Sequence, residues 1–299
     1  MPPPIGLTLE IRDPDWRDLG GWLDEAEALG LDFAELPLAE LPLVVGGRIL
    51  ASRVAAVRAL CAGRGLAYSV HGHLSINLME EPFRIGLHLD LLKANIAVAA
   101  ELGAGHLVIH TGFVPAAQAS AIEGAYARQR EHLSAMGDLA KAHGVTLCVE
   151  NIFEFEGRRV TALPGRLARE LAAIGHPNVA ATFDISHGWL HCAQQGVDFL
   201  AEAAALAPFA RHLHLHDSFG RPADFWTYTE TEALAFGVGD LHLPMGWGNV
   251  PWEALAAGCT WPADLMADLE IAPRHRSAHA EAVATTRAWV GRIRTAAPG

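Results

Sequence analysis

The stretch His212-Leu213-His214-Leu215-His216-Asp217-Ser218 alternates histidine with leucine and then ends in polar residues. Side chains of a β-strand alternate between two faces, so the three histidines would share one face and the two leucines the other. A buried imidazole needs a metal, a carboxylate or water as its partner. The stretch therefore predicts a buried strand with a metal-binding or hydrogen-bonding face; a run of hydrogen-bonded core histidines is the alternative explanation.

The rest of the chain repeats one pattern eight times, a short apolar run followed by a longer helical one. This alternation is typical of a parallel sheet with crossover helices. The predicted strands cover residues 5–11, 32–37, 66–73, 106–110, 145–151, 179–185, 210–216 and 265–271. The predicted helices cover residues 15–29, 50–64, 83–102, 115–143, 164–174, 194–207, 252–257 and 277–294. We predict an α/β fold, a single (β/α)8 TIM barrel over residues 1–299, with a long loop after the seventh strand at 219–250.

Composition and charge restrict the possible partners. The formal net charge of −12 argues against broad electrostatic attraction to nucleic acid or an anionic membrane. The four cysteines form no CxxC pair, so neither a disulfide framework nor a thiolate zinc site is indicated. The start of the chain lacks the pattern of a signal peptide, and no long apolar run indicates a membrane span. We expect a cytoplasmic protein.

The predicted strands end in residues that bind metals. A TIM barrel gathers the carboxyl ends of its strands around one mouth, and these ends carry His71, His73, His110, Glu150, Asp184, His187 and Glu270. Imidazole and carboxylate without thiolate suit Zn²⁺, Mn²⁺, Fe²⁺ or Co²⁺. Singly, Glu150 could be an ion-pair partner, His71 a loop residue and Asp184 the N-cap of a helix. Together they predict a divalent metal site with one to three ions.

The order of these motifs carries a resemblance. Five strings, together with His110 and Glu270, resemble the xylose-isomerase-like TIM-barrel superfamily. They are His71-Gly72-His73-Leu74-Ser75-Ile76-Asn77-Leu78, Glu150-Asn151, Asp184-Ile185-Ser186-His187, His214-Leu215-His216-Asp217-Ser218 and Asp240-Leu241-His242-Leu243-Pro244-Met245-Gly246-Trp247-Gly248. That superfamily includes sugar phosphate isomerases/epimerases and endonuclease IV. The resemblance implies Glu150, Asp184, His214 and Glu270 as a shared metal quartet. Endonuclease IV adds His71, His110, His187, Asp240 and His242 to make a three-zinc site.

The chain also departs from endonuclease IV. Leu74 stands where that enzyme has a tyrosine that grips DNA, and the loop at 38–47 offers proline and valine instead of basic and aromatic groups. The aromatic-rich loop before Asp240 is more like a lid over a small substrate. We therefore assign substrate contact to His73, His216, Trp226 and Trp247, with loop packing as the alternative for the aromatic residues near Trp226.

Two activities fit these residues. A sugar or sugar-phosphate isomerase/epimerase would use Glu150 and Glu270 as catalytic groups that move a proton beside the metal. An endonuclease IV-like phosphoester hydrolase would use several metals together, and the full ligand set favours it. The absent DNA-contacting loops favour the isomerase, so the expected partner is a small-molecule sugar or sugar phosphate rather than nucleic acid or membrane. A non-catalytic metal-dependent binding protein is a third class, and a homodimer is compatible with the apolar helices.

We expect duplex and abasic DNA to bind weakly at physiological salt, because a net charge of −12 repels phosphates and no basic stripe is present in the sequence. A gel-shift or anisotropy titration across a range of salt concentrations measures this. Tight binding that weakens steeply with salt would contradict the prediction.

Overall fold

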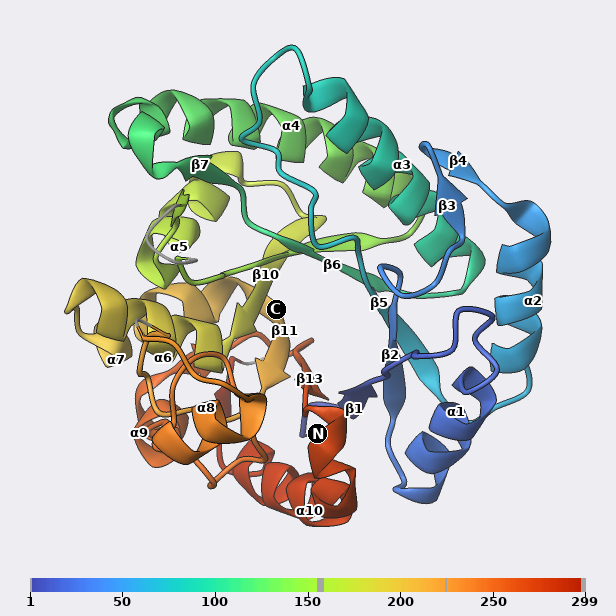
Figure 1. The fold of residues 1–299 in the computed structure, drawn as a ribbon. Coiled ribbons are helices and arrows are strands. Elements are labelled where there is room, and N and C mark those ends of the chain that lie inside the picture. The colour runs from blue at the N-terminus through green and yellow to red at the C-terminus, as the bar shows by residue number, and fades with distance from the viewer. Residues whose placement is uncertain (1, 155–158, 224, 297–299) are drawn as a thin grey trace.

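The computed structural model describes residues 2–154, 159–223 and 225–296, and it shows a ring of helices around a closed sheet (Figure 1). Eight parallel strands close in the order β1-β13-β11-β10-β8-β6-β5-β2. Their bounds are Ile5–Thr8 (β1), Phe33–Pro37 (β2), Ala67–His71 (β5), His106–His110 (β6), Thr146–Glu150 (β8), Val179–Asp184 (β10), Ala210–Leu215 (β11) and Met266–Leu269 (β13). The predicted TIM barrel is confirmed.

Helices follow the barrel strands along the chain, and most of them lie on the outside of the sheet. They are Leu19–Ala28 (α1), Ala51–Cys61 (α2), Ile85–Glu101 (α3), Ile122–Ala142 (α4), Pro164–Ile174 (α5), Ile185–Gln195 (α6), Phe199–Leu206 (α7), Glu230–Phe236 (α8), Trp252–Gly258 (α9) and His279–Val290 (α10). Short strand pairs lie outside the barrel: Val44–Val45 (β3) with Arg48–Ile49 (β4), Phe113–Pro115 (β7) with Arg159–Thr161 (β9), and Thr260–Trp261 (β12) with Arg294–Thr295 (β14). Among the described residues, no helix is both long and apolar enough to cross a lipid bilayer.

The helix predicted over 194–207 corresponds to α7, which begins later, at Phe199, and the helix before it, α6 (Ile185–Gln195), was not predicted. Helix α6 begins directly at the end of β10, where a side-chain oxygen of Asp184 accepts from the backbone N–H of His187 at 2.7 Å. It ends at Gly196, whose φ of 64° is left-handed. Helix α7 then starts from its own cap, Asp198, which accepts from two backbone N–H groups. This early start of α6 brings His187 to the mouth of the barrel.

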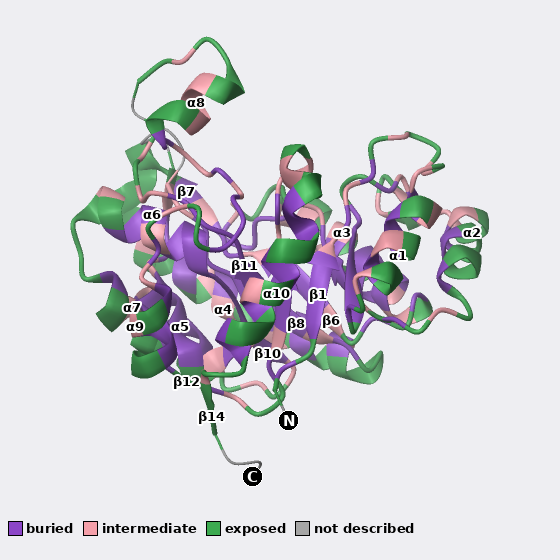
Figure 2. Cartoon of the chain, turned by 90° about the horizontal axis from the view of Figure 1, so that it is seen from below, coloured by how far each residue is buried: buried purple, intermediate pink, exposed green. Residues whose placement is uncertain are grey.

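Two other sequence predictions need adjustment. The helix predicted over 115–143 begins only at residue 122, because the preceding residues form β7 and a 3₁₀ turn, Ala116–Ala121. The long loop after the seventh barrel strand contains α8, which starts at a capping box formed by Thr229 and Glu232. Figure 2 shows α8 as an exposed lobe that projects beyond one end of the buried barrel.

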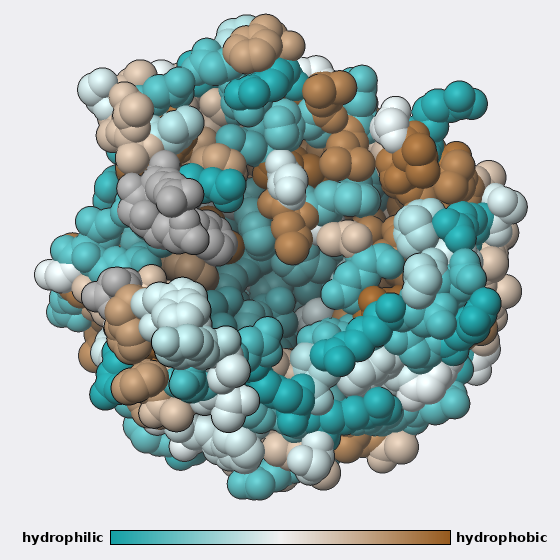
Figure 3. All heavy atoms as spheres, viewed as in Figure 1, coloured by the Kyte–Doolittle hydropathy of each residue, from teal (hydrophilic) through white to brown (hydrophobic). Residues whose placement is uncertain are grey.

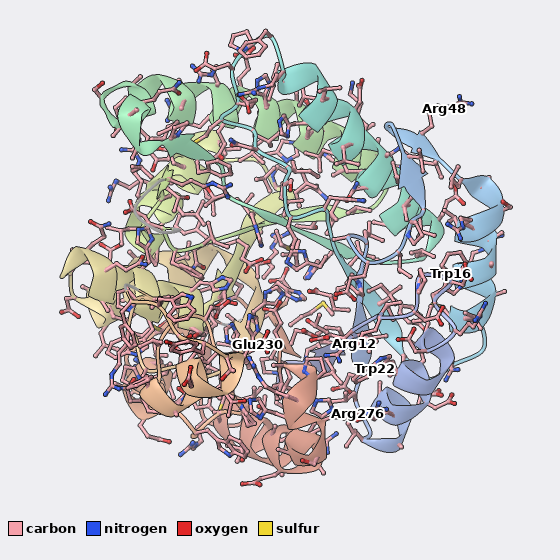
Figure 4. All side chains as sticks on the ribbon, in the orientation of Figure 1. Arg12, Trp16, Trp22, Arg48, Glu230 and Arg276 are labelled. Carbon is pink, nitrogen blue, oxygen red and sulfur yellow. The ribbon has the colours of Figure 1, made fainter. Side chains whose placement is uncertain are left out.

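The strand that opened the sequence analysis lies between β10 and β13 and is buried on both faces. Leu213 and Leu215 belong to the hydrophobic core, while His212 and His214 contact the buried carboxylate of Glu35 inside the barrel. The period of two therefore separates an apolar outer face from an ionisable inner face. Figure 4 shows how densely side chains fill the interior of the ring.

Asp217, which follows this strand, holds the chain beyond it in place. Its buried carboxylate accepts from the backbone N–H groups of Gly246 (2.7 Å) and Val250 (3.1 Å) and from the indole N–H of Trp252 (3.0 Å). Its backbone forms an isolated bridge with Leu243. Since all these donors are satisfied by one side chain, the return of the chain from the α8 lobe to the barrel depends on Asp217.

We expect Asp217→Ala to lower the free energy of unfolding by about 3 kcal/mol or more, because it leaves several donors without an acceptor in a buried place. Urea unfolding followed by circular dichroism measures the change. Asp217→Asn keeps one acceptor oxygen and should cost clearly less. A loss below about 1 kcal/mol for the alanine variant would show that this anchor is not needed.

Candidate metal centre

A central cavity opens at the carboxyl ends of the barrel strands. Its volume is about 360 Å³, and it is visible as a hollow among hydrophilic side chains in Figure 3. Polar and ionisable side chains from across the chain line it: Thr8, Glu10, Glu40, His71, His110, Glu150, His187, Asp240, His242 and Glu270. The predicted convergence of strand ends is thus present in the structure.

Four of the predicted ligands form a central cluster at the floor of this cavity: Glu150, Asp184, His214 and Glu270. Each offers one ligand atom, and these atoms all lie within 4.8 Å of one another. Nδ1 of His214 lies 3.2 Å from Glu270 Oε2 and 3.4 Å from Glu150 Oε1. Side chains from β8, β10, β11 and the end of β13 thus converge on a volume that one cation could occupy.

The donor atoms of this cluster fit a divalent cation. Glu35 accepts from Nε2 of His214 at 3.0 Å, and an ionised carboxylate only accepts, so Nε2 carries the proton. Burial would lower the pKa of His214, but the charges of Glu270, Glu150 and Glu35 raise it well above its usual range, so without a metal Nδ1 can hold a proton between two carboxylates. In the neutral ring of a metal ligand, Nδ1 points a lone pair at the same two carboxylates. Glu150 Oε1, His214 Nδ1 and Glu270 Oε2 are all buried without a hydrogen-bond partner among the described residues. A cation between them would satisfy all three.

Two histidines flank the central cluster on the side of β5 and β6, and we call them the first flank. His71 Nε2 lies 3.1 Å and His110 Nε2 3.6 Å from Oε2 of Glu150. His71 donates its Nδ1–H to the carbonyl oxygen of Gly72, which fixes Nε2 as the atom that faces Glu150. Glu150 therefore stands between the first flank and the central cluster.

His187, Asp240 and His242 form the second flank on the other side. Asp240 Oδ2 lies 3.1 Å from His187 Nε2 and 2.8 Å from His242 Nε2. His242 donates Nδ1–H to the carbonyl oxygen of Glu270 and has a φ of 46°, a left-handed value that is uncommon outside glycine. Such backbone strain is found where the surrounding structure fixes a side chain in a required position.

Burial and charge shift the pKa values of these groups strongly. Burial alone would lower the pKa of His71, but the hydrogen bond and charge of Glu150 raise it to about 9. Burial would also lower the pKa of His242, but the charges of Asp240 and Glu270 and the hydrogen bond to Asp240 together raise it to about 10. Burial dominates for His110, whose pKa falls to about 4. The surrounding histidines hold the pKa of Glu150 well below its usual range despite its burial.

Asp184 has two roles that the sequence presented as alternatives. Oδ1 caps α6 by accepting from the backbone N–H of His187, while Oδ2 lies 2.9 Å from Nε2 of His216. Burial tends to raise the pKa of Asp184, but His187 and His216 lower it overall. The carboxylate is therefore both the start of a helix and part of the central cluster.

Glu35 on β2 was not identified from the sequence. It lies beneath the central cluster, fully buried, where Oε2 accepts from Ser69 Oγ at 2.9 Å and lies 3.0 Å from Nε2 of His212. Asp268, at the same level, accepts from Thr8. Burial and the charge of Glu35 raise the pKa of Asp268 well above its usual range. The available signal was a single carboxylate in the apolar run Phe33–Pro37.

The four predicted substrate contacts do not lie together. His73 turns its Nδ1 to Asn95 Oδ1 at 3.0 Å, and Trp226 packs on Tyr228 in the α8 lobe, 72% exposed. Trp247 is 47% exposed and packs near His275. None of these three lines the central cavity.

His216, the fourth predicted contact, is fully buried and faces the ligand groups instead of the cavity. Its ring stacks on His242 with centroids 4.0 Å apart, and it lies among His187, Asp240 and His242 in a group of possible ligands. The structure thus connects it to the second flank.

A family model described as "Xylose isomerase-like TIM barrel" matches residues 23–257 of this chain. The chain belongs to this family. The resemblance inferred from the motifs is confirmed. Among curated sequences, an uncharacterized protein of Methanocaldococcus jannaschii is 24% identical over 164 residues, which is 55% of this chain and 49% of that protein. The chain thus spans about half the length of this relative.

Solved structures of this family share the fold. A D-tagatose 3-epimerase-like protein matches with a TM-score of 0.70 and 17% identity over 96% of this chain and 97% of its own. D-psicose 3-epimerase in the presence of D-fructose gives 0.67 and 15% over 96% and 99%. A Thermus thermophilus protein, TTHB071, soaked with ZnCl₂, gives 0.66 and 24% over 94% and 98%.

We expect Glu35→Gln to weaken binding of Zn²⁺ or Mn²⁺ about 10- to 100-fold, because the carboxylate that fixes the proton of His214 on Nε2 is lost. Calorimetric titration of metal-stripped protein measures the affinity, and thermal unfolding checks the fold. Ser69→Ala removes one hydrogen bond to Glu35 but keeps the carboxylate, so its effect should be smaller. An unchanged affinity in Glu35→Gln would remove Glu35 from the metal centre.

Proposed function

We propose that this protein is a divalent-metal-dependent sugar isomerase or epimerase that transfers a proton at a hydroxy-carbonyl centre. The observation that carries the proposal is the pair of carboxylates, Glu150 and Glu270, which both belong to the central cluster and line the central cavity. The sugar epimerases with the same fold support this reaction class.

The metal would be held by Glu150, Asp184, His214 and Glu270, whose ligand atoms face one another. When bound, it would supply positive charge that polarises a substrate carbonyl and makes the neighbouring carbon more acidic. The similar protein that was soaked with ZnCl₂ supports zinc as one candidate, and the imidazole and carboxylate donors suit manganese, iron and cobalt as well.

The two glutamates perform the proton transfer. One carboxylate removes the proton from the carbon that bears a hydroxyl beside the carbonyl, and the electron pair moves toward the carbonyl oxygen. The other delivers a proton, either to the opposite face of that carbon or to the former carbonyl carbon. The first outcome, in which the electron pair returns from the oxygen to that carbon, is an epimerisation. The second is an aldose–ketose isomerisation, in which the hydroxyl also loses its proton to become the new carbonyl and the former carbonyl oxygen gains one.

The charge of the cavity favours a neutral sugar over a sugar phosphate. None of the described residues that line it is lysine or arginine, and Glu10 and Glu40 lie on its wall. Burial and the negative charge of Glu40 raise the pKa of Glu10, and burial raises the pKa of Glu40. Arg12, labelled in Figure 4, pairs with Glu10 at 3.5 Å but does not line the cavity. Such a wall suits hydroxyl groups better than phosphate.

A phosphoester hydrolase is the second candidate, and the two flanks favour it. His71 and His110 on one side, and His187, Asp240 and His242 on the other, are more imidazole and carboxylate groups than a single cation needs. If all of them bind metal, several cations would supply the charge needed to stabilise a phosphoester in its transition state. The number of bound metals therefore separates the two candidates.

We expect Glu150→Ala and Glu270→Ala to abolish metal binding and turnover with little loss of fold, because neither side chain belongs to the hydrophobic core. Metal analysis and a panel of ketoses, aldoses, sugar phosphates and model phosphodiesters, with exchange of substrate C–H protons for deuterium, measure both effects. Glu253→Ala, an exposed carboxylate on α9, is the matched control. Full activity in either site variant would remove that glutamate from the mechanism.

Anomalous scattering from a crystal soaked in zinc or manganese decides between the two candidates. A single peak within the central cluster supports the isomerase. Additional peaks at both flanks, together with hydrolysis of a phosphodiester and no proton exchange in any sugar, would overturn it.

A further inference from the structure

A second cavity of about 280 Å³ lies beside the central one, and we call it the side cavity. Its lining is Leu74, Ser75, Ile76, His110, Thr111, Phe113, Ile152, Phe153, Arg159 and Thr161. Four of these side chains, Leu74, His110, Ile152 and Phe153, also line the central cavity. The two cavities are therefore neighbours, and a ligand at the central cluster can reach the side cavity past His110.

The side cavity is built by the small β7–β9 pair and the loop after β5. β7 and β9 are antiparallel, with Phe113 opposite Thr161, and the hydroxyl of Thr161 donates to the carbonyl oxygen of Gly112 at 2.9 Å. Thr111 Oγ1 accepts from the side-chain amide of Gln129 at 3.3 Å. The Thr161 hydroxyl therefore has no proton left to donate into the cavity, whereas the Thr111 hydroxyl keeps its proton.

The remaining wall is largely apolar. Leu74, Ile76, Phe113, Ile152 and Phe153 provide aliphatic and aromatic surface, and hydrophobic spheres border the central hollow in Figure 3. Among the described lining residues, only Arg159 carries a permanent charge, and its guanidinium carbon lies 4.5 Å from the centre of the Phe113 ring. The side cavity thus differs in character from the acid-lined central cavity.

We propose that the side cavity is a subsite for an apolar substituent, so that the substrate is a sugar that carries an aryl or branched alkyl group. This inference rests on the proposed function for the sugar itself, which would lie at the central cluster. The hydroxyl-bearing part of such a molecule would lie in the central cavity, and its apolar part would lie in the side cavity. Burial of the apolar group would add affinity that a free monosaccharide cannot gain.

Two non-reactive probes test this on the metal-loaded protein: phenyl β-D-glucopyranoside and methyl β-D-glucopyranoside, titrated by calorimetry. We expect the phenyl compound to bind at least about tenfold more tightly, because its ring leaves water for an apolar wall. Ser75→Trp fills the side cavity from an exposed position and should abolish that preference while leaving methyl glucoside binding unchanged. Ser75→Ala, which keeps the space, should retain the preference.

Ala142→Trp is the matched control, since it adds the same indole at the exposed end of α4, at the opposite end of the barrel. Equal affinity for the two glucosides in the unmodified protein would overturn the proposal, as would a preference that survives in Ser75→Trp. If Ser75→Trp instead impairs binding of glucose 6-phosphate only, the side cavity is an anion subsite and the proposal is also overturned.

The two glucosides have no free carbonyl group and cannot be isomerised, so binding and turnover are separate readouts. A phenyl preference without proton exchange in any sugar would contradict the proposed function and leave the subsite standing. Proton exchange in free ketoses without a phenyl preference would support the proposed function and contradict the apolar subsite.

Discussion

The structure depends on histidines at the barrel mouth, two buried and one half-buried, each of which uses its two ring nitrogens for different contacts. His71, His214 and His242 each use one nitrogen to donate to a protein acceptor, namely a backbone carbonyl or Glu35. In each ring the other nitrogen faces a carboxylate. Without a metal, a proton can occupy this second nitrogen, because the nearby carboxylates raise the pKa of His71 to about 9 and that of His242 to about 10. A bound metal ion would replace that proton. The arrangement therefore suits a cation through the orientation of the rings as well as through the types of side chain.

The barrel makes this orientation possible because strands that are distant in sequence supply the two sides of each contact. Glu35 on β2 and His214 on β11 are 179 positions apart, yet the closed sheet brings them within 3.0 Å. Glu35 is fully buried, so it acts from beneath the cavity and leaves the mouth open for substrate. Asp217, at the end of β11, supports the site from the other side, because it holds the returning chain segment that carries Asp240 and His242. A rigid layer thus supports the ligands from both ends.

Most ligand candidates could be predicted because they follow local rules. The period of two in β11 and the polar residues at strand ends are visible in short windows of sequence, and eight repeats were enough to indicate a barrel. Glu35 could not be found this way, since its partners are set only by closure of the sheet. The position of His187 required the start of α6 at Asp184, and a residue that can be a cap or a ligand gives no local sign that it is both. Trp226 lies near α8, which starts at the Thr229 capping box, and it does not line the central cavity, so substrate contact by this residue stays a prediction.

The same ligand set could serve proton transfer or phosphoester hydrolysis, so the ligands alone do not determine the reaction. What distinguishes the two is the molecule that can approach them. A phosphodiester would bring its negative charge past Glu10 and Glu40, with no lysine or arginine among the described residues lining the central cavity to offset the repulsion. A neutral sugar meets the same carboxylates as hydrogen-bond acceptors, and the apolar wall beside His110 offers its remaining surface a place to pack. The walls of the two cavities, more than the metal ligands, therefore favour a neutral substrate with one apolar end.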